Sequence, residues 1–259
     1  MIIRPRIIPV LLIDNQSLVK TIKFKNPNYL GDPINATRIF NEKAVDELCI
    51  LDISASRELK GPDFKMLKDI AEEAFMPLSY GGGINSLEDA KTILKMGYEK
   101  VVFNTSSINN TEMIKNLINE VGSQSVVVSI DFKKSLLSKK CFIRNGSVKT
   151  SHTPLELAKM MQRLGVGEII LQAIDNDGMM NGYDIETIKE VSQGVSIPVI
   201  ACGGASSIQN LREALSLGGA SAVAAGSLFV YYGKKKAVLI NYPDETTLFE
   251  KGVYYERNL

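Results

Sequence analysis

Two glycine-rich turns in this sequence have the composition of phosphate-binding sites. Each follows a short apolar run and leads into a helical pattern, the first through Gly82 and Gly83 and the second through Gly203 and Gly204. Residues without a Cβ atom allow backbone N–H groups to approach an anion closely, and the next helix N-terminus adds unpaired donors and the positive end of its dipole. One glycine cluster alone is as often an ordinary loop, so the prediction of phosphate binding depends on the second turn.

The two turns are parts of a longer internal repeat. Pro77 and Pro198 are separated by 121 residues, and the same offset relates eight further pairs of identical residues. These pairs are Gly82 and Gly203, Gly83 and Gly204, Ser86 and Ser207, Gly97 and Gly218, Ser106 and Ser227, Glu47 and Glu168, Gly61 and Gly182, and Asp63 and Asp184. We therefore expect two copies of one unit of about half the chain length, each with its own phosphate site.

The segments that must position these turns alternate between apolar strands and helices. Eight strands are expected at residues 6–12, 47–52, 76–80, 100–103, 125–130, 168–172, 198–201 and 220–224. Helical patterns lie at residues 33–43, 63–74, 87–96, 112–120, 155–164, 185–193 and 211–217. Apolar strands separated by helices are typical of a parallel sheet covered on both faces, and eight of them in 259 residues favour closure. The sequence thus predicts that residues 1–259 form a single α/β domain, a (β/α)8 TIM barrel built from two duplicated half-barrels.

Two insertions fall where such a barrel places its working loops. Residues 20–32 follow the first predicted strand, and residues 132–153 follow the fifth. The second insertion is expected to contain a small hairpin, because Asn145 and Gly146 are a typical pair of turn residues. Their matching positions, one in each half of the chain, agree with a duplication.

The charge balance and the cysteine content exclude several classes of function. Thirty basic residues against 29 acidic ones leave a net charge of +1, so no nucleic acid or membrane partner is expected. The three cysteines, Cys49, Cys141 and Cys202, have no metal-binding spacing, and no metal or other cofactor is expected. Because the sequence has no signal peptide or long apolar span, a reducing, cytoplasmic location is expected.

Motifs distributed along the whole chain resemble those of one family. They include Arg6-Ile7-Ile8-Pro9, Gly31-Asp32-Pro33, Leu51-Asp52-Ile53, Gly81-Gly82-Gly83-Ile84, Ile130-Asp131, Asp175-Asn176-Asp177-Gly178 and Gly182-Tyr183-Asp184. With these motifs the sequence resembles the cyclase subunit of imidazole glycerol phosphate synthase, the HisF type. The resemblance implies a lyase of histidine biosynthesis that takes ammonia from a partner glutaminase of the HisH type. Its substrate would be a ribulosyl aminoimidazole carboxamide ribotide (PRFAR) with a phosphate at each end. The products would be imidazole glycerol phosphate and an aminoimidazole carboxamide ribotide (AICAR).

The same resemblance assigns the substrate-binding residues. The first phosphate site would comprise Gly82, Gly83, Asn104 and Thr105, and the second Asp177, Gly178, Gly203, Gly204, Gly226 and Ser227. Asp52 would orient substrate hydroxyl groups, and Lys20 would act from a mobile loop. Two of these residues have simple structural alternatives, Lys20 as a solvated loop lysine and Ser227 as the cap of the turn after the last strand.

Four charged residues stand near the beginnings of four predicted strands. They are Arg6, Glu47, Lys100 and Glu168. In the family that the sequence resembles, such a ring closes the bottom of the barrel as a gate through which ammonia passes, and Glu99 would keep the acidic character of the glutaminase dock. The alternative is four separate surface salt bridges, which would contribute little to stability. We favour the gate because charges that point into a barrel mouth are costly unless paired.

The resemblance is incomplete at the catalytic residues. The family uses two aspartates as general acid and base, and Asp131 occupies the second position. The first position falls on Leu12, which cannot transfer a proton, and Asp14 would lie about 6 to 7 Å farther along an extended strand. Further departures are Met179, where the family tends to have threonine, and the loop around His152, the only histidine. A solvated loop histidine is the favoured interpretation of His152.

Three functions therefore remain open at the level of sequence. The first is the cyclase of histidine biosynthesis, working with Asp131 and a reduced acid/base set. The second is a HisF-like duplicate that channels ammonia to another amidotransferase, for example in acetamidino-sugar formation for surface polysaccharide. The third is the related single-chain isomerase of the same pathway, against which the charge ring argues because an isomerase takes up no ammonia.

Overall fold

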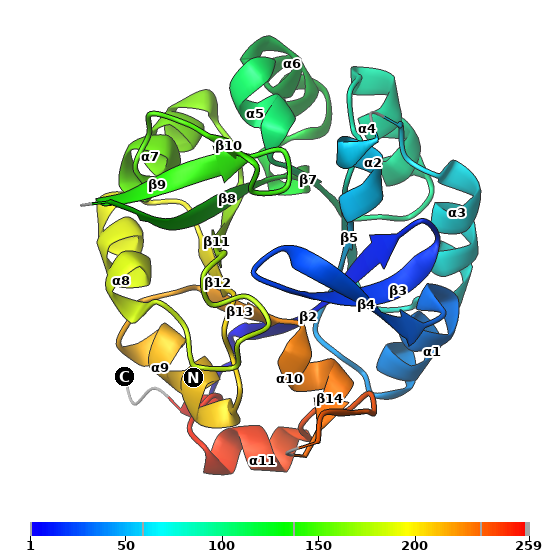
Figure 1. Ribbon diagram of the computed structural model, residues 1–259, viewed down its shortest axis with the longest axis vertical. Coiled ribbons are helices and arrows are strands. Elements are labelled where there is room, and N and C mark those ends of the chain that lie inside the picture. Colours follow the sequence, from blue (N-terminus) through cyan, green and yellow to red (C-terminus); the bar gives the residue numbers. More distant parts are fainter. Residues whose placement is uncertain (1, 59, 137, 234, 257–259) are drawn as a thin grey trace.

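Eight parallel strands close into a barrel in the computed structural model, which describes residues 2–58, 60–136, 138–233 and 235–256 (Figure 1). In chain order they are β2 (Arg6–Asp14), β5 (Leu48–Asp52), β6 (Leu78–Gly81), β7 (Lys100–Phe103), β8 (Val126–Ser135), β11 (Glu168–Ala173), β12 (Val199–Cys202) and β13 (Ala222–Ala225). Each pairs in parallel with the next, and β13 closes on β2 with Ala222 opposite Arg6. The predicted (β/α)8 fold is confirmed.

Helices cover the outside of the barrel in the predicted order. The long ones are α1 (Pro33–Glu42), α3 (Phe64–Glu73), α4 (Leu87–Lys95), α6 (Thr111–Val121), α7 (Pro154–Leu164), α8 (Ile185–Gly194) and α9 (Ile208–Ser216). Shorter ones are α2 (Ile53–Arg57), α5 (Thr105–Asn109), α10 (Ser227–Val230), α11 (Glu245–Glu250) and the 3-10 turn η1 (Ser123–Ser125). The largest error concerns α9, which was expected from residue 211. It begins at Ile208 because the Ser207 side chain accepts a hydrogen bond from the backbone N–H of Asn210 and caps the helix there.

The helix caps repeat between the two halves of the barrel. Asp63 caps α3 and Asp184 caps α8, each by accepting from the backbone N–H three residues on. Ser86 and Ser207 cap α4 and α9 in the same way. These pairs have the offset found in the sequence, and their matching places agree with two duplicated half-barrels.

Both insertions form antiparallel hairpins on the carboxyl side of the barrel strands (Figure 1). The first, expected as a loop, consists of β3 (Ser17–Ile22) and β4 (Lys25–Gly31). In the second, β8 continues beyond the barrel to pair with β9 (Ser138–Ile143), which pairs in turn with β10 (Val148–Lys149). The turn at Asn145 and Gly146 was predicted, and both residues have the positive φ angles that such turns require.

The apolar core has two layers separated by the barrel wall. Along β2, Ile7, Leu11 and Ile13 belong to the cluster between strands and helices, whereas Ile8 and the alternate residues after it face inward. The inner cluster consists of Ile8, Val10, Leu12, Val19, Cys49, Val102, Val127, Ile170, Ile200, Cys202, Ala222 and Ala224. The barrel interior is therefore apolar along most of its length.

Two small sheets complete the described fold. The strand β1 (Ile2–Ile3) pairs with β16 (Tyr255–Glu256), and β14 (Tyr231–Tyr232) pairs with β15 (Ala237–Val238). Across the described residues, no helix is both long and apolar enough to cross a bilayer.

The three cysteines are free thiols buried in the fold. Burial raises the pKa of Cys49 and of Cys141 to about 12, and it also raises the pKa of Cys202. The thiols are therefore protonated near neutral pH.

Replacing Gly204 by alanine is expected to lower the free energy of unfolding by about 2–3 kcal/mol. Gly204 has a φ of +109°, and an added Cβ atom would lie 2.1 Å from the carbonyl oxygen of Gly182. The matched control is Gly61→Ala, because nothing lies within 4 Å of a Cβ atom at Gly61. The urea midpoint of each variant measures the effect, and equal midpoints would contradict the close packing of this turn.

Candidate functional site

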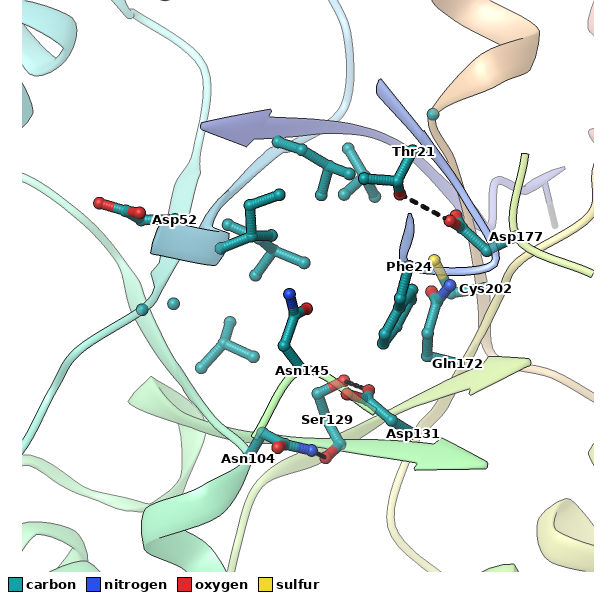
Figure 2. A pocket seen from close by; sticks show the side chains of 18 of the residues that line it. Thr21, Phe24, Asp52, Asn104, Ser129, Asp131, Asn145, Gln172, Asp177 and Cys202 are labelled. Carbon is teal, nitrogen blue, oxygen red and sulfur yellow. Dashed lines mark hydrogen bonds between the residues drawn. The ribbon is translucent and has the colours of Figure 1, made fainter. Parts of the chain in front are cut away.

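A cavity of about 380 Å³ opens at the carboxyl ends of the barrel strands (Figure 2). Its lining includes every residue that the sequence suggested for catalysis or substrate binding. These are Lys20, Asp52, Gly82, Gly83, Asn104, Thr105, Asp131, Asp177, Gly178, Gly203, Gly204, Gly226 and Ser227. The fold thus collects residues from both halves of the chain around one space.

The first glycine turn forms one wall of this cavity together with the start of α5. Asn104 donates through Nδ2 to the carbonyl oxygen of Ser129 at 3.0 Å, which fixes its amide against β8. The Thr105 hydroxyl accepts from the backbone N–H of Arg144 at 3.0 Å, in the turn between β9 and β10. Gly82 and Gly83 have positive φ angles, as Gly203 and Gly204 do. The two turns therefore present similar backbone shapes to the cavity.

A buried lysine lies between the loop after β11, which holds Asp177, and the turn after β13, which holds Gly226. The Lys20 Nζ atom is 3.8 Å from Oδ1 of Asp177, and the Thr21 hydroxyl donates to Oδ2 of Asp177 at 2.9 Å. Lys20 is only 7% exposed, and a Cβ atom added to Gly226 would lie 2.3 Å from its Nζ. The ammonium group therefore lies against Gly226 in the turn after β13, and the interpretation of Lys20 as a solvated loop lysine was wrong.

Ser227 brings an unused hydroxyl to the same turn. Its Oγ atom is buried and has no hydrogen-bond partner in the described part of the chain. It makes no side-chain cap for α10 either, so the capping alternative was wrong. A buried hydroxyl without a partner is costly unless a ligand or water accepts its proton, and a place in the cavity lining would let an anion do so.

Asp131 is the carboxylate best suited to moving protons. It is buried on β8, and burial, together with the charge of Asp177, raises its pKa to about 7 although the hydrogen bond from Ser129 lowers it. The Ser129 hydroxyl donates to Oδ1 of Asp131 at 2.7 Å (Figure 2). A group with a pKa near neutrality is present in both protonation states and can therefore act as acid or base.

Replacing Asp131 by asparagine is expected to change the pH dependence of stability. Because the folded-state pKa is about 7 and the unfolded value about 4, the folded chain retains a proton that the unfolded chain has released between these values. Stability from this group is therefore present at low pH and is lost as the pH rises toward 7. Between about pH 5 and about pH 8, the free energy of unfolding of Asp131→Asn should rise by about 2–3 kcal/mol relative to that of the unchanged chain. Urea unfolding at both pH values measures this, and a pH-independent difference would contradict the raised pKa.

At the position where the resemblance implies a first catalytic aspartate, the chain has Leu12. Leu12 lines the cavity as part of the inner apolar cluster. Asp14 is not among the lining residues, and its carboxylate accepts from Arg57 at 2.8 Å. Asp14 therefore does not replace the missing acid.

Asp52 has a structural task in addition to its place in the cavity wall. Its Oδ1 atom accepts from the backbone N–H groups of Ser54 and Ala55, and from the Ser54 hydroxyl, at 2.7–2.9 Å. Figure 2 shows its carboxylate directed away from the centre of the cavity. In this conformation Asp52 caps α2.

Several lining residues were not identified from the sequence. Ser129 lies two residues before Asp131 on the same strand, so the alternation of strand side chains could have indicated it. Phe24, Arg144 and Asn145 lie at hairpin turns, for which no strand pattern gives the direction of the side chain. Gln172, on β11, is a polar residue that follows three apolar ones.

Met179 and His152 lie outside the cavity lining. Met179 is exposed, and the His152 carbonyl accepts from the backbone N–H of Cys141. Within the described residues, no three His, Cys, Asp or Glu side chains come together in a way that would hold a metal ion.

The four charged residues at the amino ends of the strands form one closed cluster. Arg6 pairs with both Glu47 and Glu168, and Lys100 Nζ lies 2.8 Å from Glu47 and 3.0 Å from Glu168. Glu47 is nearly fully buried, so the cluster closes the end of the barrel. The alternative of four separate surface salt bridges was wrong.

An apolar interior connects this charged cluster with the cavity. On the inward side of β2, Arg6 is followed by Ile8, Val10 and Leu12, and the last two line the cavity. On the outer surface, Glu99 is exposed beside Lys100 in a groove with Tyr98 and Gln124. The molecule thus has a charged lower end, an apolar centre and a polar upper cavity.

The chain is similar in sequence to known proteins of one family. The model of the family described as histidine biosynthesis protein matches residues 6–236. A protein of Leptospira interrogans, provisionally named imidazole glycerol phosphate synthase subunit HisF, is 51% identical over 252 residues, covering 95% of this chain and 99% of its own. A Pseudomonas aeruginosa protein provisionally named subunit hisF2 is 49% identical, covering 95% and 98%. The imidazole glycerol phosphate synthase subunit HisF of Alkaliphilus metalliredigens is 40% identical, covering 88% and 91%.

Proposed function

Because the chain belongs to the histidine biosynthesis protein family, with HisF subunits as its relatives, we propose that it is a synthase subunit that uses ammonia to convert PRFAR to imidazole glycerol phosphate and AICAR. One observation carries this proposal: two similar glycine turns face one cavity from opposite sides. They follow β6 and β12, the third and seventh strands of the eight-stranded ring. A ligand with a phosphate at each end matches such a pair of sites.

The proposed roles of the cavity residues follow from their places. Backbone N–H groups of the two turns would hold the two phosphates, together with Asn104, Thr105, Asp177, Gly178, Gly226 and the free hydroxyl of Ser227. Lys20 would neutralise the phosphate at the second turn. Asp131 would move the protons needed for ring closure and bond cleavage, because its pKa of about 7 supports both directions. Asp52 would reach substrate hydroxyl groups only after leaving its position as the cap of α2.

Ammonia would enter at the opposite end of the barrel. We assign the cluster of Arg6, Glu47, Lys100 and Glu168 as the gate and the inner apolar cluster as the conduit, since an uncharged molecule of this size crosses an apolar space that disfavours ions. The partner would be a HisH-type glutaminase seated over the amino ends of the strands, beside Glu99. Cytoplasmic histidine biosynthesis would be the setting.

A second candidate function is favoured by Leu12. A chain that keeps the gate and conduit but lacks one of two proton-transferring groups could deliver ammonia to another amidotransferase, as in acetamidino-sugar formation for surface polysaccharide. In that case the cavity would pass ammonia on, with PRFAR turned over slowly or not at all.

The decisive experiment is an assay of the purified chain with PRFAR and ammonium salts, which bypasses the glutaminase. Formation of imidazole glycerol phosphate and AICAR in equal amounts, lost in Asp131→Asn, would support the synthase. Binding of PRFAR without turnover, combined with ammonia transfer from a co-purified glutaminase, would support the conduit. A crystal soaked in phosphate provides an independent test, and ions absent from both glycine turns would overturn the two-site proposal.

A further inference from the structure

The two hairpins over the cavity have an unusual charge composition. Residues 17–31 and 132–152 contain nine Lys and Arg residues and no Asp or Glu. The remainder of the chain therefore holds only 21 of the 30 basic residues but all 29 acidic ones. In this nearly neutral protein, positive charge is thus concentrated on the two hairpins at the mouth of the cavity.

Most of these charges are not compensated by carboxylates. In the part of the chain that the structure describes, only Lys20 and Lys139 among the nine have a carboxylate within 4 Å. Lys133 instead donates to the carbonyl oxygen of Gly146 at 3.2 Å and lies 4.1 Å from the centre of the Phe142 ring. Such neutral contacts position a cation without cancelling its field.

The hairpin tips meet at the mouth of the cavity. A Cβ atom added to Gly146 would lie 3.1 Å from the Phe24 ring, so the β3–β4 turn touches the β9–β10 turn. The Lys23 backbone N–H donates to the carbonyl oxygen of Asp177 at 2.9 Å, which ties the first tip to the loop after β11. Arg144 is tied in the same manner to Thr105, and both Phe24 and Arg144 line the cavity.

We infer that Lys23, Lys25, Lys133 and Arg144 form a basic rim that draws a multiply phosphorylated small molecule into the cavity, and that Arg144 binds its phosphate at the first glycine turn. This inference rests on the proposed function for the ligand class. Lys23 and Lys25 flank Phe24, which touches the turn that holds Arg144, so these charges lie on adjoining turns. Their fields add most strongly at low salt, where the screening length is longest. Arginine holds phosphate through two parallel N–H donors, whereas lysine acts as a point charge.

Two variants separate the steering charge from the direct contact. Lys23→Gln with Lys25→Gln removes two exposed charges, and the matched control is Lys65→Gln with Lys68→Gln on the outer face of α3. The probe is fructose 1,6-bisphosphate, a doubly phosphorylated sugar, measured by calorimetric titration at low and at physiological ionic strength. The rim variant should bind the probe about fivefold more weakly at low ionic strength and lose most of that difference at the higher one. The control pair should bind as the unchanged chain does.

Arg144→Ala should weaken probe binding by about ten- to a hundredfold at both ionic strengths. Arg144→Lys should restore only part of the lost affinity. Unchanged affinity in both rim variants would overturn the inference and would fit a surface for an acidic protein instead. Failure of the proposed reaction is distinguishable, because PRFAR would then remain unconverted while the probe still bound in a rim-dependent way.

Discussion

Replacing Leu12 by aspartate is expected to raise the rate of ammonium-dependent PRFAR cyclisation by about 10²- to 10⁴-fold, from a weak or undetectable starting value. Loss of one member of an acid/base pair costs a factor of this size even where substrate binding is intact. Leu12 already faces the cavity that Asp131 lines, so a carboxylate at this position would reach the same space. The measurement is the rate of AICAR formation from PRFAR with ammonium salts in the absence of glutaminase.

Leu12→Asn is the matched control, because it has the shape of aspartate but transfers no proton. A gain in Leu12→Asp that is absent in Leu12→Asn and is abolished by adding Asp131→Asn would establish an acid/base pair. Full turnover in the unchanged chain, insensitive to substitution at Leu12, would show that Asp131 alone is sufficient. A silent Leu12→Asp variant that still binds PRFAR would favour the ammonia conduit.

Replacing Glu47 by glutamine is expected to lower the free energy of unfolding by about 3–5 kcal/mol. Glu47 is 3% exposed and pairs with both Arg6 and Lys100, so its loss leaves two cations with only Glu168 between them. Glu73→Gln is the control, because it breaks an exposed pair with Arg38, for which we expect a much smaller loss of stability. Urea unfolding gives both values.

The same variant tests the gate. If ammonia passes the cluster, Glu47→Gln should reduce the glutamine-dependent rate in the complex while the rate with ammonium salts changes little. Equal reduction of both rates would show that the cluster supports the fold and does not control the passage of ammonia.

Much of the fold could be predicted from the sequence because the internal repeat gives the same order of strands, turns and helices in both halves of the chain. The helix after Ser86 was expected at the correct start, but the repeat was not used to place the helix after Ser207, which was expected three residues too late. The β3–β4 hairpin was missed because its turn, at Lys23 and Phe24, contains no Gly, although both residues adopt positive φ angles. Tertiary contacts, such as the bond from Lys23 to Asp177, stabilise that turn, and no local pattern reports them.

Many of the site residues could be predicted from the sequence, but their protonation and side-chain conformations could not. The motifs named thirteen of the lining residues, yet the pKa of Asp131 depends on burial and on Asp177, which is distant in the sequence. The use of the Asp52 carboxylate as a helix cap likewise depends on the short helix that follows it. Whether the four gate charges meet depends on barrel closure, since Arg6 and Glu168 are brought together only by the ring of strands.

The burial of all three cysteines makes the chain a convenient background for fluorescent labelling. Thiol-reactive dyes attack the thiolate, and a protonated thiol inside a packed core offers neither the charge nor the access that the reaction needs. A cysteine introduced at Tyr29, which is 67% exposed on the first hairpin, would therefore be the single maleimide-reactive position without removal of any native cysteine. A dye there would report the movement of that hairpin as ligands enter the cavity.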